Sequence, residues 1–158
     1  MRIAHVVVVL MTLGLLAVGC GWKPPAPQAT NTQGCADTDG PTTDTVDAAV
    51  KELPAAQWKK GDSGNTGDCA LHWVVVTSGD ASDSPQQVLF FDHNVSIGSP
   101  TPDPRPYITV TPMGNETASV QYQWRQGQDP ACCPTGIGTV RVKIDNGKLE
   151  ALDPIPSG

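Results

Sequence analysis

The residues best suited to do chemistry in this sequence are its five cysteines. Cys20 directly follows Ala17-Val18-Gly19, which is typical of the cleavage region of an export signal. A thiol at that position can accept a diacylglycerol before the signal is cut away. We therefore predict that Cys20 becomes the lipid-modified N-terminus of the mature protein.

The residues before Cys20 favour the same interpretation. Arg2 supplies a positive charge, and residues 6–18 are apolar except for Thr12. This run is shorter than the roughly 20 residues that a membrane-crossing helix needs. Residues 1–19 are therefore predicted to be a removable signal peptide. The alternative is an ordinary signal peptide followed by an incidental Cys20.

Residues 20–34 combine prolines with small polar residues, a composition typical of a semi-rigid tether. Each buried methylene of an acyl chain contributes about 0.8 kcal/mol, and two or three chains give stable anchoring. We expect the lipid bilayer to be the partner of an acylated Cys20, on the extracytoplasmic face of the cell membrane. Residues 35–158 then form a single domain of ordinary size.

The other cysteines are an even set in an oxidising compartment, where disulfides are expected. They are Cys35, Cys69, Cys132 and Cys133. The bond between Cys132 and Cys133 is disfavoured, because neighbouring Cα atoms are about 3.8 Å apart, below the usual disulfide range. The two remaining pairings join Cys35 and Cys69 each to one of the adjacent cysteines, and both stay open. A metal site or a catalytic thiol is the alternative use of these residues.

No metal or other cofactor is predicted, because the chain has no CxxC motif and only His72 and His93 remain after the signal. Asp37-Thr38-Asp39-Gly40 is similar to the start of a calcium-binding loop. An EF-hand loop needs glycine at its sixth position and glutamate at its twelfth, whereas Gly40 comes fourth. We interpret this segment as a turn that leads into a helix.

Ser63 lies in a Gly-Asp-Ser-Gly segment that is similar to the nucleophile segment of trypsin-like proteases. Those enzymes place a histidine and an aspartate earlier in a much longer chain, whereas both histidines follow Ser63 here. We interpret residues 61–68 as a solvated loop, His72 as a hydrogen-bonded core residue and His93 as an exposed turn residue. No catalytic residue is predicted; the alternative is a small hydrolase whose nucleophile and base meet only in three dimensions.

The charge of the chain limits its partners. Once Arg2 is removed with the signal, nine basic and 16 acidic residues remain, without a basic cluster. Nucleic acid is excluded as an expected partner, because phosphate binding needs a positive stripe.

The elements that position these residues are one helix and a series of strands. Residues 43–53 have an apolar stripe at helical spacing, with Thr43 or Asp44 as N-cap and Pro54 beyond the end. Strands are predicted from alternating or continuous apolar residues at 71–77, 87–92, 95–98, 107–111, 118–124, 139–144 and 148–152. The fold class is therefore α+β, with one helix packed on a twisted antiparallel sheet of six or seven strands.

Three local features complete this prediction. His93-Asn94 is expected to form a tight turn in which Asn94 takes the positive φ. Residues 71–77 are apolar on both alternating faces, as expected of a strand covered on both sides. Five aromatic residues could line an apolar groove but are better explained as core. They are Trp58, Trp73, Tyr107, Tyr122 and Trp124.

Residues 88–102, Val-Leu-Phe-Phe-Asp-His-Asn-Val-Ser-Ile-Gly-Ser-Pro-Thr-Pro, resemble the LppP/LprE family of actinobacterial lipoproteins. Residues 69–76 and the closing Leu152-Asp153-Pro154-Ile155-Pro156 are similar as well, so the resemblance spans about residues 35–156. His93-Asn94 departs from it where a glycine is expected in the turn. The resemblance implies a mycobacterial-type cell-envelope lipoprotein and supplies no catalytic residue.

These observations lead us to expect a non-enzymatic module that binds an envelope protein or lipid, or that has a structural role. The reason is that the sequence has strong targeting signals but no coherent set of catalytic residues.

Overall fold

The computed structural model describes residues 34–158. The expected signal peptide, the lipidation site Cys20 and nearly all of the expected tether lie outside the described residues. Within residues 34–158, no helix is both long and apolar enough to cross a membrane.

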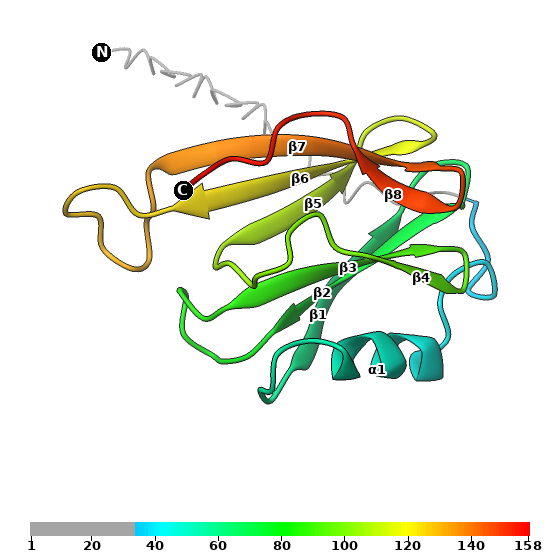
Figure 1. Ribbon diagram of the computed structural model, residues 1–158, viewed down its shortest axis with the longest axis horizontal. Helices are drawn as coiled ribbons and strands as arrows, with labels where there is room; N and C mark the ends of the chain where they lie inside the picture. Colours follow the sequence, from blue (N-terminus) through cyan, green and yellow to red (C-terminus); the bar gives the residue numbers. More distant parts are fainter. Residues whose placement is uncertain (1–33) are drawn as a thin grey trace, which may run out of the picture. The chain divides into compact units, whose positions relative to one another are not determined.

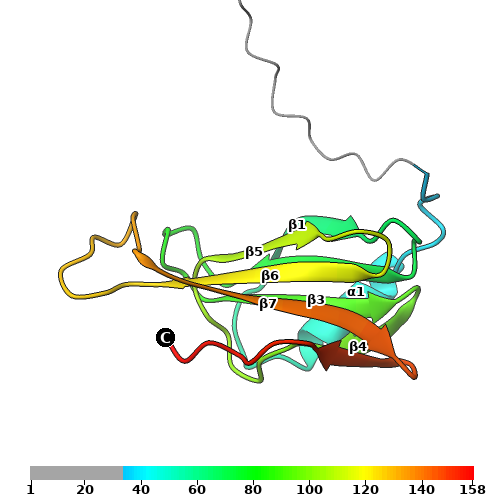
Figure 2. The same ribbon diagram turned by 90° about the horizontal axis from the view of Figure 1, so that it is seen from above.

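The described part contains one helix and eight strands (Figure 1). The elements are α1 (Thr43–Lys51), β1 (Lys59–Asn65), β2 (Leu71–Thr77), β3 (Gln86–Asp92), β4 (Val95–Gly98), β5 (Ile108–Pro112), β6 (Thr117–Trp124), β7 (Gly136–Asp145) and β8 (Lys148–Ala151). They form two antiparallel sheets, sheet A in the order β1-β2-β3-β4 and sheet B in the order β5-β6-β7-β8. The sheets face each other, and α1 covers the other side of sheet A (Figures 1 and 2).

The expected single sheet of six or seven strands is therefore wrong. The one helix and the antiparallel pairing are confirmed within residues 34–158. The chain leaves sheet A after β4 through residues 99–106, which include four prolines. Proline removes a ladder hydrogen bond, so this segment cannot continue a sheet. Its one bridge to a strand joins Arg105 to Gln86, and β5 then starts the second sheet.

Two layers of buried side chains hold the elements together. The layer between the sheets consists of Leu71, Trp73, Val75, Val88, Phe90, Ile108, Ala118, Val120, Tyr122, Val140 and Val142. The layer between sheet A and the helix consists of Val46, Ala49, Val74, Val76, Leu89 and Phe91. Because successive strand side chains point to opposite faces, β2 and β3 contribute to both layers, which confirms that residues 71–77 are covered on both sides.

The N-cap of the helix lies one residue before the first predicted cap. Thr42 is the N-cap, and its Oγ1 accepts a hydrogen bond from Thr45 N at 3.3 Å. Thr42 takes the extended backbone conformation that a cap requires, whereas Thr43 and Asp44 are already helical. The predicted N-caps Thr43 and Asp44 are therefore wrong by one or two positions.

The segment expected to be a loop at residues 61–68 instead contributes most of β1. Strand β1 pairs with β2 along its length, with a register shift between Lys60 and Ser63. Its Gly, Asp, Ser and Asn residues have low strand propensity, but the free edge of β2 offers backbone partners that override it. The bulge and the exposed polar side chains protect this sheet edge from pairing with other chains.

The turn between β3 and β4 forms where expected but with a different backbone. The positive φ of 51° falls on His93, and Asn94 does not share it. Asn94 instead contacts the helix, because its Oδ1 accepts hydrogen bonds from Thr42 N at 2.8 Å and Thr45 Oγ1 at 2.7 Å. The turn is thereby tied to the start of α1. The final turn needs positive φ at Asn146 and Gly147, which suits the Asn-Gly pair.

Candidate functional site

The disulfides join different cysteines from those expected. Cys35 pairs with Cys69, with a Cα–Cα distance of 5.5 Å, and Cys132 pairs with its neighbour Cys133. Both pairings that the sequence left open are therefore wrong, and the disfavoured one is present. The reason is the length of β6, whose eight residues extend over about 25 Å.

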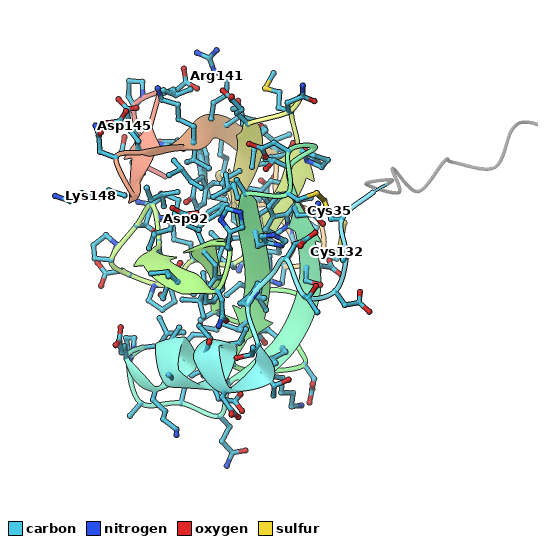
Figure 3. The ribbon with its side chains drawn as sticks, turned by 90° about the vertical axis from the view of Figure 1, so that its right-hand side faces the viewer. Cys35, Asp92, Cys132, Arg141, Asp145 and Lys148 are labelled. Carbon is cyan, nitrogen blue, oxygen red and sulfur yellow. A yellow bond between two sulfur atoms is a disulfide. The ribbon has the colours of Figure 1, made fainter. Side chains whose placement is uncertain are left out.

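The two disulfides lie at opposite ends of the sandwich. Asn115, just before β6, accepts a backbone hydrogen bond from Asp68 beside Cys69. The far end of β6 leads into the distal loop, residues 125–135, which carries Cys132 and Cys133 and extends from the other end (Figures 1 and 2). Figure 3 looks at the molecule from the end that carries Cys35.

Thr66 organises the turn that carries Cys69. Its buried hydroxyl donates to Asp68 Oδ1 at 2.6 Å and accepts from Leu71 N at 3.2 Å. Its carbonyl accepts from Cys69 N at 3.0 Å and from Asn65 Nδ2 at 2.9 Å. Because one buried residue satisfies four partners, this turn is held firmly in the position that allows Cys69 to reach Cys35.

A cavity of about 340 Å³ opens beside Cys35, between the junction segment (residues 35–41) and strands β1 and β2. Its lining residues are Cys35, Ala36, Asp37, Gly40, Pro41, Val46, Ser63, Gly64, Asn65, His72, Trp73 and Val74. The junction segment and β1 supply most of the polar groups, β2 supplies His72 beside apolar side chains, and α1 supplies Val46. We refer to it as the junction cavity.

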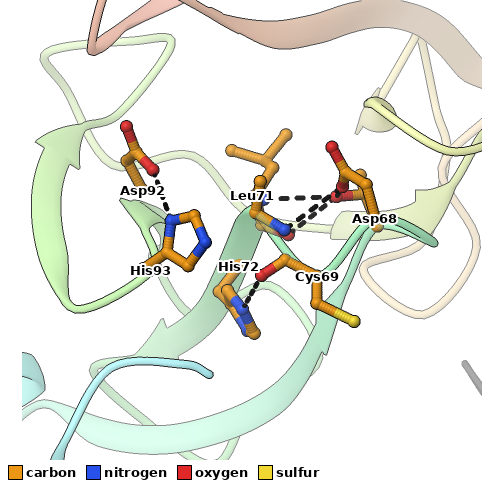
Figure 4. Close-up of polar contacts among 8 residues, drawn as sticks. Asp68, Cys69, Leu71, His72, Asp92 and His93 are labelled. Carbon is orange, nitrogen blue, oxygen red and sulfur yellow. Dashed lines mark hydrogen bonds and ion pairs between the residues drawn. The ribbon is translucent and has the colours of Figure 1, made fainter. Parts of the chain in front are cut away.

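His72 forms part of the wall of the junction cavity. Its side chain is largely buried, and Nε2 lies 2.8 Å from the carbonyl oxygen of Cys69 (Figure 4). Because a carbonyl only accepts, Nε2 carries the proton. The Nδ1 side of the ring packs on Gly40, where an added Cβ would lie 2.8 Å from Nδ1. The prediction of a hydrogen-bonded core histidine is confirmed.

The structure brings Ser63 and His72 to one cavity and leaves His93 elsewhere. Ser63 pairs with Val74, two positions from His72, so both side chains are on the same face of sheet A. Within the described residues, Ser63 makes no side-chain hydrogen bond to His72. His93 is exposed in its turn, as predicted, and its Nδ1 lies 2.7 Å from Asp92 Oδ1 (Figure 4).

A second, smaller cavity has three carboxylates in its wall, from Asp68, Asp92 and Glu116. Asp68 already accepts hydrogen bonds from Thr66 and Ala70, and Asp92 contacts His93. No group of three metal-ligating side chains with suitable geometry occurs among residues 34–158.

The five aromatic residues divide between full and partial burial. Trp73 and Tyr122 are 3% and 1% exposed and belong to the core between the sheets, as predicted. The other three are half-buried: Trp58, Tyr107 and Trp124. Burial raises the pKa of Tyr122, whose hydroxyl has no hydrogen-bond partner among the described residues, and Arg105 lies over its ring.

The distal loop is held together by Asp129. Its Oδ2 accepts hydrogen bonds from Gln126 N and from both N and Oγ1 of Thr135, each at 2.8 Å. Hydrogen bonds from the Gln126 backbone and then from Thr135 lower the pKa of Asp129. The carbonyl of Ala131, next to Cys132, accepts from Tyr107 Oη. The loop is therefore fixed at its base and beside the cysteines.

Sequence reasoning missed Asn65, Thr66 and Asp129. A polar residue inside a Gly-rich run carries no burial signal, and only the pairing of β1 with β2 encloses Thr66. Asp129 beside Pro130 was a detectable turn signal. The hydrogen bonds that Asp129 accepts, however, depend on the end of the loop bringing Thr135 back beside it.

The comparisons with known proteins agree with the family resemblance found in the sequence. No solved structure matches this chain. A model of the LppP/LprE lipoprotein family matches residues 63–147. Proteins named "Putative lipoprotein LppP" from Mycobacterium bovis and Mycobacterium tuberculosis are 52% identical over 150 residues, covering 91% of this chain and 86% of theirs. This chain therefore belongs to the LppP/LprE lipoprotein family.

Proposed function

We infer that this lipoprotein is a non-enzymatic binding module of the cell envelope. In this proposal Cys20 carries the lipid, the bilayer holds it on the extracytoplasmic face, and the junction cavity binds a small polar component of the envelope. The observation that carries the proposal is the lining of the junction cavity by residues of the junction segment, which directly follows the proposed tether in the sequence.

In this proposal the tether keeps the junction cavity within reach of the membrane. Fourteen residues lie between Cys20 and Cys35 in the sequence, which allows a span of at most about 50 Å when the segment is fully extended. The Cys35–Cys69 disulfide joins the junction segment covalently to the β1–β2 turn. The wall of the cavity is therefore preorganised, which lowers the entropic cost of binding.

The lining suits a ligand with several hydroxyl or amine groups. Ser63 and Asp37 are exposed, and neither side chain has a hydrogen-bond partner among the described residues. Asn65 uses its Nδ2 for Thr66 O and Cys35 Sγ, which leaves its Oδ1 as an acceptor. Val46 and Trp73 supply apolar surface. A few polar groups over an apolar base are typical of small-ligand sites.

The anchoring half of the proposal is tested with Cys20→Ser. We expect the native protein to fractionate with membranes and to gain the mass of its acyl chains, and the variant to lose both. Membrane fractionation of Cys20→Ser equal to that of the native protein would contradict this assignment.

The binding half is tested with Ser63→Trp, which places a large side chain in the junction cavity. Thr111→Trp is the matched control, because Thr111 is exposed on sheet B, away from this cavity. The probe is a polar-lipid extract of the native envelope, added to the full mature protein in detergent and followed by native mass spectrometry. We expect bound mass in the native protein and in Thr111→Trp, and none in Ser63→Trp. Equal binding by all three proteins would contradict the assignment of the site.

A small hydrolase is the second candidate, because Ser63 and His72 share the junction cavity. A fluorophosphonate probe that labels the native protein but not Ser63→Ala would favour this candidate over the binding module. The hydrogen bond from His72 Nε2 to Cys69 O favours the binding module over the hydrolase, because it keeps that nitrogen from contacting Ser63.

A further inference from the structure

The bond between Cys132 and Cys133 contributes little to folding. It joins two neighbouring residues, so it removes little freedom from the unfolded chain. The Cys35–Cys69 bond closes a segment with a sequence separation of 34, so it restricts the unfolded chain far more. Stability therefore accounts for Cys35–Cys69 but not for the adjacent pair.

The adjacent pair is also the accessible one. Cys132 and Cys133 are both exposed, in a loop that extends from the sandwich (Figure 1). Cys35 and Cys69 are half-buried, and Asn65 Nδ2 and the Thr66 carbonyl lie at Cys35 Sγ. Because thiol–disulfide exchange needs a thiolate to reach a sulfur atom, access favours attack on Cys132–Cys133.

The surroundings hold the adjacent pair outward without covering it. Tyr107 Oη and Ser82 Oγ both donate to the Ala131 carbonyl, the latter at 3.1 Å. Asp129 fixes the two ends of the loop through Gln126 and Thr135. These contacts fasten the backbone on both sides of the cysteines, and among residues 34–158 no hydrogen bond is made to either sulfur.

We propose that the Cys132–Cys133 bond is a thiol–disulfide exchange site whose reaction partner is a dithiol, meaning a molecule or protein domain with two neighbouring thiols. This site is separate from the junction cavity and does not depend on the proposed binding function. It lies at the other end of the sandwich, so one can operate without the other.

The exchange balances in two steps. A thiolate of the dithiol attacks Sγ of Cys132 or Cys133, the bond between the two cysteines breaks, and the other cysteine leaves as a thiolate. The second thiolate of the partner then attacks the mixed disulfide and releases the remaining cysteine. Two electrons and two protons pass from the dithiol to Cys132 and Cys133, and the partner becomes a disulfide.

Adjacency explains why the partner is a dithiol rather than a monothiol. After the first attack, the released cysteine is next to the mixed disulfide and can expel the attacking thiol at once. An intramolecular thiol has a high effective concentration, so a monothiol is returned before a second monothiol arrives. A partner with its own second thiol resolves the mixed disulfide in competition with ring closure.

The test uses the full mature protein in detergent, treated with dithiothreitol or with glutathione at equal thiol concentration. Free thiols are trapped with an alkylating agent and located by peptide mass spectrometry, while circular dichroism follows the fold. We expect Cys132 and Cys133 to become labelled together at a dithiothreitol concentration about ten-fold or more below that needed for Cys35 and Cys69. The fold should be unchanged. After treatment with glutathione, far less alkylation of Cys132 and Cys133 is expected.

The Cys132→Ser variant supplies the second measurement. In this variant Cys133 is a free thiol, and it is treated with oxidised glutathione, the disulfide form. The Cys133 thiolate should attack that disulfide, release one reduced glutathione and keep the other as a stable mixed disulfide, because no neighbouring thiol can expel it. The Cys35→Ser/Cys69→Ser variant is the control, and labelling of Cys132 and Cys133 should keep its dithiothreitol dependence there. Free thiols at Cys132 and Cys133 in the untreated protein, joint reduction of both pairs, or equal labelling by both reagents would overturn the proposal.

Discussion

The two disulfides occupy opposite ends of one sandwich and differ in what they connect. Cys35–Cys69 joins the junction segment to the β1–β2 turn, across a sequence separation of 34. Cys132–Cys133 joins two neighbours within a single loop. The first therefore restricts the unfolded chain and supports the wall of the junction cavity, whereas the second leaves the long-range structure unconstrained.

The residues that make polar contacts around the two disulfides also differ in burial. The first is surrounded by the buried Thr66 and the largely buried His72. The second is supported by Asp129 and Thr135, of which Thr135 is exposed. Because a hydrogen bond is more costly to break where water cannot replace it, equal changes should have unequal effects at the two ends.

The largest effect is expected from removing the long-range disulfide. Cys35→Ser/Cys69→Ser should lower the free energy of unfolding by about 4 kcal/mol, because the unfolded chain gains the freedom of the closed segment. Denaturant titration of oxidised native and variant proteins measures this difference. A loss below about 1 kcal/mol would contradict the structural role of this disulfide.

The Thr66 hydroxyl is expected to have the next largest effect. Thr66→Val keeps the shape of the side chain but removes the contacts to Asp68 Oδ1 and Leu71 N, which should cost about 1–3 kcal/mol. Thr135→Val removes a comparable contact to Asp129 at the exposed end and should cost less. Denaturant titration of both variants tests this ranking, and a larger loss for Thr135→Val would contradict it.

Removing the adjacent disulfide should change stability only slightly. Cys132→Ser/Cys133→Ser is expected to lower the free energy of unfolding by about 1 kcal/mol or less. The same denaturant titration measures the change beside the Cys35→Ser/Cys69→Ser variant. A loss as large as that of the long-range pair would show that the distal loop is coupled to the core.

The smallest and most local effect is expected from acid. Hydrogen bonds from Gln126 and Thr135 lower the pKa of Asp129 in the folded protein. Its contribution is therefore complete above the unfolded pKa of about 4 and is lost as the pH falls through the lowered folded pKa. Hydrogen exchange at residues 126–135 should quicken over that range relative to the rest of the chain. Asp129→Asn should remove this local pH dependence, and its persistence in the variant would exclude Asp129 as the cause.

Local patterns in the sequence predicted several elements because each pattern carries its own physical cause. The stripe of Val46 and Ala49 predicted a helix, and the all-apolar residues 71–77 predicted a strand covered on both faces. Strand β6 alternates buried Val120 and Tyr122 with less buried neighbours, as predicted. The fine backbone differed, because Asn94 bonds to α1 and the positive φ passes to His93.

The candidate site was less predictable than the elements. His72 and Ser63 were both singled out, but their meeting in one cavity depends on β1, which the sequence predicted to be a loop. The strand exists because β2 has a free edge, and nothing in the Gly-rich run itself indicates this. The prediction of the cysteine pairing failed for a similar reason, because the length of β6 separates Cys69 from the distal loop.

The sequence by itself determined the family, helix α1 and most of the strands, because these follow from motifs and periodicities of neighbouring residues. Only the tertiary structure decided that the strands divide into two sheets and that residues 59–65 pair with β2. It also decided that each disulfide joins two cysteines at the same end of the sandwich. These features depend on which distant surfaces meet, and that is set by packing of the whole domain.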